Sequence, residues 1–146
     1  MIRIIHQRFW DFDARTRKTL RRATFREGYM RPFSVAFPDS PVIAVFGKRH
    51  LLGWVLILSH GHGNDPLVST FVNIRYRKRG IGTFLITETI RRYRRIRLGA
   101  WDKETTRLFY RLQDTYPKHI TVFDWPDYAH IYRDLLEEAQ SYPPIF

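Results

Sequence analysis

One stretch of the sequence constrains the fold more than any other. An apolar segment over residues 67–74 runs directly into the turn Arg77-Lys78-Arg79-Gly80-Ile81-Gly82, and apolar residues then recur every three to four positions to about Arg94. This order predicts a strand over 67–74, a tight turn, and a helix that begins at Gly82. Four cations lie in or beside the turn, at positions 75, 77, 78 and 79.

A strand, a glycine turn and a helix start together suit an anionic ligand. Glycine lets the backbone approach a ligand closely and lets consecutive N–H groups point the same way. The first N–H groups of a helix have no partner within it, and the helix dipole is positive at that end. These features predict a cradle for a pyrophosphate. It is neither a Walker loop, since no Gly-Lys-Ser/Thr follows, nor a dinucleotide-binding fingerprint, since the third glycine is missing.

The composition indicates one domain over residues 1–146 with an aromatic-rich core. The chain is 44% hydrophobic and 16% aromatic. It has no cysteine, which excludes disulfides, a thiol nucleophile and thiolate metal sites and suits a reducing compartment. The longest apolar run, residues 51–58, is too short to span a bilayer, and the N-terminus lacks a signal-peptide pattern. We therefore expect a soluble, cytoplasmic protein.

Positive charge is concentrated in parts of the chain. Lysine and arginine exceed aspartate and glutamate by 25 − 14 = 11. Residues 75–97 hold nine cations and one acid, and residues 1–36 hold nine cations and three acids. Such segments attract phosphates, nucleic acid or acidic partners. The arginine-rich run 91–97 has two interpretations: a solvated helix end that complements the dipole, or a contact for a polyanion with Tyr93 available for stacking.

The remaining pattern predicts strands that alternate with helices, and so an α/β fold or α+β sandwich. The expected strands are 1–6, 42–46, 51–59, 67–74, 96–99 and 119–125, with a hairpin turn at 47–50. The expected helices are 11–27 (capped by Asp11 or Asp13), 82–94, 103–114 (capped by Asp102) and a last one after Asp127. Residues 142–146 are a candidate for a seventh strand.

Two motifs resemble those of a known superfamily. The stretch from Val72 to Gly82 is similar to the acetyl-CoA motif of the GNAT superfamily of N-acetyltransferases. Residues 96–98 followed by 103–112 resemble the second motif of that superfamily, a short strand and a helix with a tyrosine. The resemblance covers about residues 67–112 and implies a mixed, mostly antiparallel central sheet flanked by helices.

The resemblance also implies an activity and its site. It implies transfer of an acetyl or other short acyl group from acetyl-CoA to a primary amine, directly within a ternary complex and without a metal. Backbone N–H groups would hold the pyrophosphate, and nearby cations the other phosphates. The implied CoA-binding residues are Val72, Ile74, Arg75, Arg77, Lys78, Arg79, Gly80, Ile81, Gly82 and Thr83. A main-chain N–H near the end of strand 67–74 would polarise the acyl carbonyl.

Tyr110 corresponds to the superfamily's tyrosine and is the candidate general acid for the departing thiolate. Arg107, one helical turn away, would lower the pKa of the phenol if it faces the same way. The alternative is that Tyr110 is an ordinary core aromatic beside Phe109.

The general base is less defined by the sequence. The strand 67–74 contains no carboxylate, so Asp65 just before it is the candidate base, with His60 and His62 nearby. The amine could instead lose its proton to water. His60 and His62 do not suggest a metal site, because no third ligand accompanies them.

Two hypotheses about function remain open at this stage. One is an N-acyltransferase whose acceptor amine belongs to a protein, a small molecule or a nucleic-acid base. The other is a catalytically inactive relative that binds nucleic acid or an acidic protein through its arginine-rich surface. The resemblance leaves room for a homodimer, and the sequence suggests no membrane contact.

Overall fold

The computed structural model describes residues 2–26, 39–58, 65–99 and 103–123, without the side chains of 23–26, 74 and 103–105. The predicted helix after Asp127, the candidate strand 142–146 and the cap Asp102 lie outside the described residues.

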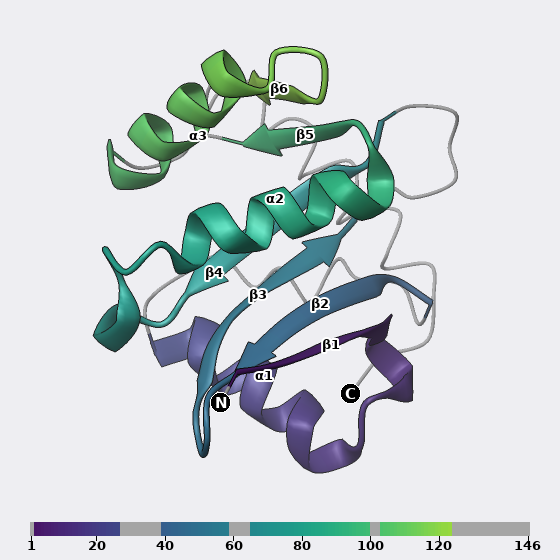
Figure 1. Cartoon of the computed structure of the whole chain (residues 1–146). Coiled ribbons are helices and arrows are strands. Elements are labelled where there is room, and N and C mark those ends of the chain that lie inside the picture. Colours follow the sequence, from purple (N-terminus) through teal and green to yellow (C-terminus); the bar gives the residue numbers. More distant parts are fainter. Residues whose placement is uncertain (1, 27–38, 59–64, 100–102, 124–146) are drawn as a thin grey trace.

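The described residues form a six-stranded sheet with helices on both of its faces (Figure 1). The strands are β1 (Arg3–Arg8), β2 (Pro41–Phe46), β3 (Leu51–Ile57), β4 (Leu67–Val72), β5 (Ile96–Gly99) and β6 (Ile120–Phe123). The helices are α1 (Ala14–Arg26), α2 (Ile81–Tyr93) and α3 (Lys103–Thr115), with short 3-10 turns η1 (Phe9–Asp11) and η3 (Ile74–Tyr76).

The strands lie in the sheet in the same order as in the chain. Strands β1 to β4 pair antiparallel, and β4, β5 and β6 pair parallel through the helical connections α2 and α3. The predicted mixed, mostly antiparallel sheet flanked by helices is therefore confirmed. Every residue of β3 is buried, as expected of a central strand that is covered on both faces.

Two separate cores cover the two faces of the sheet. On one face Leu20 of α1 and Phe9 pack with Trp54 and Phe71, whose rings stack at 5.7 Å. On the other face the buried residues of α2 and α3, Leu85 and Phe109 among them, pack on the alternate residues of the same strands. Because successive side chains of a strand point to opposite faces of the sheet, each strand contributes residues to both cores.

Element boundaries differ from the predicted ones by a few residues, for local reasons. Of the two candidate caps of α1, the structure selects Asp13, whose carboxylate accepts from the Thr16 N–H at 2.7 Å. Asp11 instead pairs with Arg8 at 2.8 Å. Strand β4 ends at Val72 rather than at 74, because Asn73 begins the η3 turn.

Gly53 allows the close contact between β3, β4 and α2. A Cβ at this position would lie 2.6 Å from the Phe71 carbonyl oxygen and 2.9 Å from Leu85 Cδ1. Ile81, the first residue of α2, would be 3.5 Å away. The first turns of α2 therefore lie directly over β3 only because Gly53 has no side chain.

We predict that Gly53→Ala lowers the free energy of unfolding by about 2 kcal/mol, since the new methyl group overlaps a backbone oxygen that cannot move away cheaply. Gly47→Ala is the matched control: its nearest contact is Leu52 Cδ2 at 3.4 Å, so a change of less than ~0.5 kcal/mol is expected. Urea denaturation of both variants measures this. Equal effects would contradict the packing role of Gly53.

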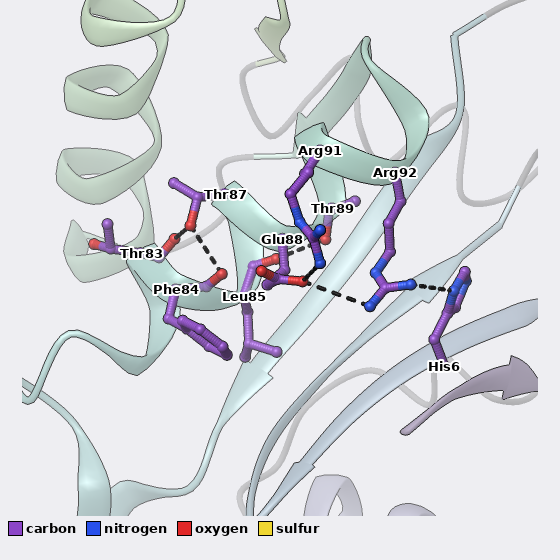
Figure 2. A network of polar contacts seen from close by, with 9 residues as sticks. All are labelled: His6, Thr83, Phe84, Leu85, Thr87, Glu88, Thr89, Arg91 and Arg92. Carbon is purple, nitrogen blue, oxygen red and sulfur yellow. Dashed lines mark hydrogen bonds and ion pairs between the residues drawn. The ribbon is translucent and has the colours of Figure 1, made fainter. Parts of the chain in front are cut away.

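A polar network ties the edge strand β1 to the C-terminal end of α2 (Figure 2). His6 Nδ1 lies 3.1 Å from Arg92 Nη1, and His6 Nε2 lies 2.9 Å from the Tyr93 hydroxyl. Because arginine only donates, Nδ1 accepts, and the imidazole is neutral with its proton on Nε2. Burial and the charge of Arg92 lower the pKa of His6 from its ordinary value.

This contact predicts a pH dependence of stability. The folded pKa of His6 lies below the unfolded value of about 6.5, so protons bind preferentially to the unfolded chain. The contribution of neutral His6 to the free energy of unfolding is complete above pH ~6.5, and it is lost as the pH falls through the folded pKa of His6. In an NMR titration Arg92→Gln should raise the pKa of His6, while Arg91→Gln should leave it unchanged, since Arg91 contacts Glu88. A His6 pKa insensitive to Arg92 would refute the assignment.

Candidate functional site

The connection between β4 and α2 is held against the start of β3 by Asn73. The Asn73 N–H donates to the Leu52 carbonyl at 2.8 Å, and its Nδ2 donates to the Leu51 carbonyl at 3.1 Å. Its Oδ1 accepts from the Arg75 N–H at 3.2 Å. Asn73 was not among the site residues predicted from the sequence, although asparagine at the end of a strand is a recognised turn signal.

Arg77 stabilises the loop that contains it. Its Nε donates to the Val72 carbonyl at 3.1 Å, so this part of the guanidinium is turned toward the end of β4. The guanidinium of Arg79 lies 5.7 Å from the centre of the Tyr76 ring. The side chains of Arg75, Lys78 and Arg79 are exposed. The predicted cations therefore divide into one that shapes the loop and three that face solvent.

The first turn of α2 has the features of an anion site. Gly80 precedes the helix with a positive φ of 82° and, as a glycine, has no side chain to cap the first turn. The first helical bond is donated by the Phe84 N–H to the Gly80 carbonyl at 2.9 Å. The N–H groups of residues 81–83 precede that bond and have no acceptor within the helix. No acid stands in the first turn, so these groups and the dipole attract an outside anion.

The two glycines of the motif have different roles. A Cβ at Gly80 would meet nothing within 4 Å, so glycine is needed there for its positive φ alone. A Cβ at Gly82 would lie 2.9 Å from Leu108 Cδ2 and 3.6 Å from Val72 Cγ2. The sequence predicts that the second glycine lets the backbone approach a ligand. The structure shows that it also makes room for the Leu108 side chain of α3.

The hydrophobic members of the predicted CoA set belong to the core. Val72 and Ile81 are partly buried and pack against the cluster under α2 and α3. The side chain of Ile74 lies outside the described residues. Thr83 is half-buried on the first turn of α2, beside Phe84 (Figure 2).

The parallel ladder between β4 and β5 is short. Only Leu67 and Val68 of β4 pair with β5, opposite Arg97 and Leu98. Residues 69–72 continue beyond this ladder toward the loop and remain paired with β3 on their other side. The strand therefore leads from the paired part of the sheet to the anion site.

Tyr110 lies on α3 and is half-buried, whereas Phe109 beside it is 2% exposed and belongs to the core. Leu108 of α3 contacts the first turn of α2 at Gly82. Tyr110 follows two positions later, about 200° around the helix. Tyr110 therefore lies on a different face of α3 from Leu108, the residue that contacts Gly82.

Asp65 lies at the far end of β4 from the anion site. It is exposed, and its main-chain carbonyl accepts from Arg97 Nε at 2.7 Å. At ~3.3 Å per residue, the chain from Asp65 to Val72 spans up to about 23 Å if extended. The structure therefore does not bring this candidate base together with the loop. His60 and His62 lie outside the described residues.

Within the described residues, no group of three or more histidine, cysteine or acidic side chains is arranged to hold a metal ion. In the same part of the chain, no helix combines the length and hydropathy needed to cross a membrane.

The chain has the fold of GNAT acetyltransferases. It is similar to a GNAT-family acetyltransferase of Streptococcus pneumoniae, with a TM-score of 0.60 and 16% identity over 78% of this chain and 86% of that one. It is also similar to the Escherichia coli protein ElaA, with a TM-score of 0.52 and 17% identity over 62% of this chain and 68% of that one. Neither the protein-family models nor the curated proteins match this sequence.

The hydrogen bond from Arg77 to the Val72 carbonyl predicts that the anion site depends on the shape of the loop as well as on its charge. Arg77→Lys keeps the charge but removes the Nε donor, so we expect affinity for CoA to fall about fivefold (~1 kcal/mol). Arg75→Lys, at an exposed position, should change it less than twofold. Titration calorimetry measures both. Identical affinities for the two variants would show that the loop does not need this hydrogen bond.

Proposed function

We propose that this protein is a GNAT-type N-acyltransferase that transfers an acetyl or other short acyl group from CoA to a primary amine. The observation that carries the proposal is the helix start at Gly80, where the N-cap residue has no side chain, in a loop of exposed cations at the end of β4. Its occurrence on the GNAT fold supports CoA, which presents a diphosphate and a third phosphate, over a simpler anion.

The backbone would bind the diphosphate, and the exposed cations would bind the remaining charge. The N–H groups of residues 81–83 point out of the first turn of α2 and suit diphosphate oxygens. Arg75, Lys78 and Arg79 lie in the same loop, each with its side chain exposed. Lys78 has a positive φ of 63°, which is costly for a residue with a side chain. A cation in this strained position supports a role for its charge.

The end of β4 would position the reacting group. CoA supplies an activated thioester at the end of an extended arm that contains amide groups, and such arms pair well with a strand. Residues 69–72 extend beyond the ladder with β5 and lead to the anion site. A main-chain N–H of this segment would then polarise the thioester carbonyl.

Acyl transfer needs one proton removed and one supplied. The amine nitrogen attacks the thioester carbon, the carbon–sulfur bond breaks, and the thiolate takes a proton. We assign the proton supply to Tyr110, the half-buried phenol of α3. The proton of the amine would pass to Asp65, the exposed carboxylate just before β4, or to water.

The acceptor remains a choice among three classes: a protein amine, a small molecule, or an amine of a nucleic-acid base. The net charge of 25 − 14 = +11 favours an acceptor with acidic or phosphate-bearing surroundings over a cationic lysine-rich tail.

The acid assignment predicts that Tyr110→Phe lowers kcat by about a hundredfold with little change in affinity for acetyl-CoA. Tyr116→Phe is the matched control, since this phenol is on the exposed turn after α3 and should leave kcat unchanged. CoA release from acetyl-CoA, followed with a thiol reagent across a panel of amines, measures both. Full activity of Tyr110→Phe would remove Tyr110 from the mechanism.

The same assay separates the enzyme from an inactive binding module. An enzyme releases CoA only when an acceptor is supplied. Binding of acetyl-CoA without release by any amine, polyamine, peptide or nucleic acid would favour the binding module. Absence of calorimetric binding to CoA would rule out the acyltransferase and leave a polyanionic partner as the explanation of the arginines.

A further inference from the structure

A second group of basic residues lies at the opposite end of α2 from the anion site. Arg94 and Arg95 form the turn between α2 and β5, and Lys118 and His119 belong to the turn between α3 and β6. All four side chains are exposed. We call these four residues the basic cluster.

Hydrogen bonds join the two turns of the basic cluster. His119 Nδ1 lies 2.6 Å from the Arg94 carbonyl oxygen and must donate to it, because a carbonyl only accepts. The Ile96 N–H donates to the His119 carbonyl at 2.8 Å. Residues 25 positions apart in the chain are therefore fixed side by side, at the start of the parallel strands β5 and β6.

The basic cluster is separate from the candidate CoA site. Helix α2 runs from the loop at the end of β4 to the start of β5 (Figure 1), and its 13 residues span about 20 Å. A CoA molecule bound at residues 78–83 therefore leaves the side chains of residues 94, 95, 118 and 119 exposed.

The charge of the cluster exceeds what the helix end needs. The C-terminus of a helix carries about half a negative charge. Arg91 and Arg92 already stand in the last turn, and both pair with Glu88 (Figure 2). Asp114 is the acid closest in sequence to Lys118. Arg94 and Arg95 add two charges beyond those that the dipole and Glu88 account for.

The backbone at Arg94 gives independent support for a role of its side chain. Arg94 has a φ of 66°, and it ends α2 where glycine is the favoured residue. Within the described residues only Lys78 and Arg94 combine a side chain with a positive φ, and both are cations. An arginine at this position costs stability that glycine would not, so a cation there indicates a use for the charge.

We propose that the basic cluster binds the phosphate backbone of a nucleic-acid strand and that Tyr116 stacks on a base. Tyr116 is 36% exposed, and its carbonyl accepts from the His119 N–H at 3.0 Å, so it adjoins the cluster. Arginines beside an exposed aromatic ring, on a chain with a pI of about 10.4, favour nucleic acid over an acidic protein. This surface does not depend on the proposed acyltransferase activity.

The proposal is tested with a fluorescein-labelled oligouridylate by anisotropy, on the full chain, between about 50 and 200 mM salt. Removing three cations should weaken binding at least tenfold at low salt. Each phosphate contact contributes ~0.7 to the slope of log K, the association constant, against log salt, so the slope should fall by about 2. The variant is Arg94→Gly/Arg95→Ala/Lys118→Ala. Arg94→Gly also relieves the positive φ, so the thermal midpoint should not fall.

The matched control removes three exposed cations of α1, on the other face of the sheet. It is Arg15→Ala/Lys18→Ala/Arg22→Ala, with the same change in net charge. It should keep its affinity within about twofold, as expected when distant charges are screened. An equal loss in both variants would overturn the proposal, because binding would then follow overall charge.

Two further measurements identify the ligand and the site. Tyr116→Ala should weaken oligouridylate binding about tenfold and leave binding of poly-glutamate unchanged. If poly-glutamate bound as tightly as RNA and lost the same affinity in the triple variant, the ligand of the cluster would be an acidic protein and not nucleic acid. Saturating CoA should not displace the RNA. Competition between them would place the RNA at the loop after β4 and refute the basic cluster.

Discussion

The close approach of α2 to β3 is the contact on which the rest of the structure depends. It is possible because Gly53 leaves room between the Phe71 carbonyl and the first turns of the helix. With α2 seated there, its N-terminus comes to the end of β4 and its C-terminus to the start of β5. The helix thus places unbonded N–H groups at one end of the sheet and arginines at the other. Both properties come from a single packing contact and from the direction of the chain.

The arrangement of elements follows from features that short stretches of sequence contain. The alternation of apolar residues, the glycines at 80 and 82 and the polar turns predict the strands and helices within a few residues. The hairpin over 47–50 and the order of strands and helices from 67 to 115 are as predicted, because each depends on neighbouring residues. The resemblance to GNAT motifs supplied the sheet type, which periodicity alone does not determine.

The details of the site depend on which strands become neighbours, and so could not be predicted from local patterns. Asn73 anchors the loop because Leu51 and Leu52 of β3 lie beside it. Gly82 serves a contact with Leu108 of α3, 26 positions away in the chain. Arg77 was grouped with the phosphate ligands by its charge, but its Nε is turned to the Val72 carbonyl. Charge shows that a residue attracts anions in principle, whereas its hydrogen bonds decide whether it is free to do so.

The arginines of this chain accordingly should not be counted as one electrostatic surface. Arg77 and Arg97 donate to main-chain carbonyls, and Arg91 and Arg92 pair with Glu88. The positive φ at Lys78 and Arg94 singles out two other cations, one beyond each end of α2. At each of these positions a glycine would satisfy the backbone better, so the fold does not explain the side chain. The two ends of one helix therefore present separate positive surfaces, and the distance of about 20 Å between them allows two anionic ligands at once.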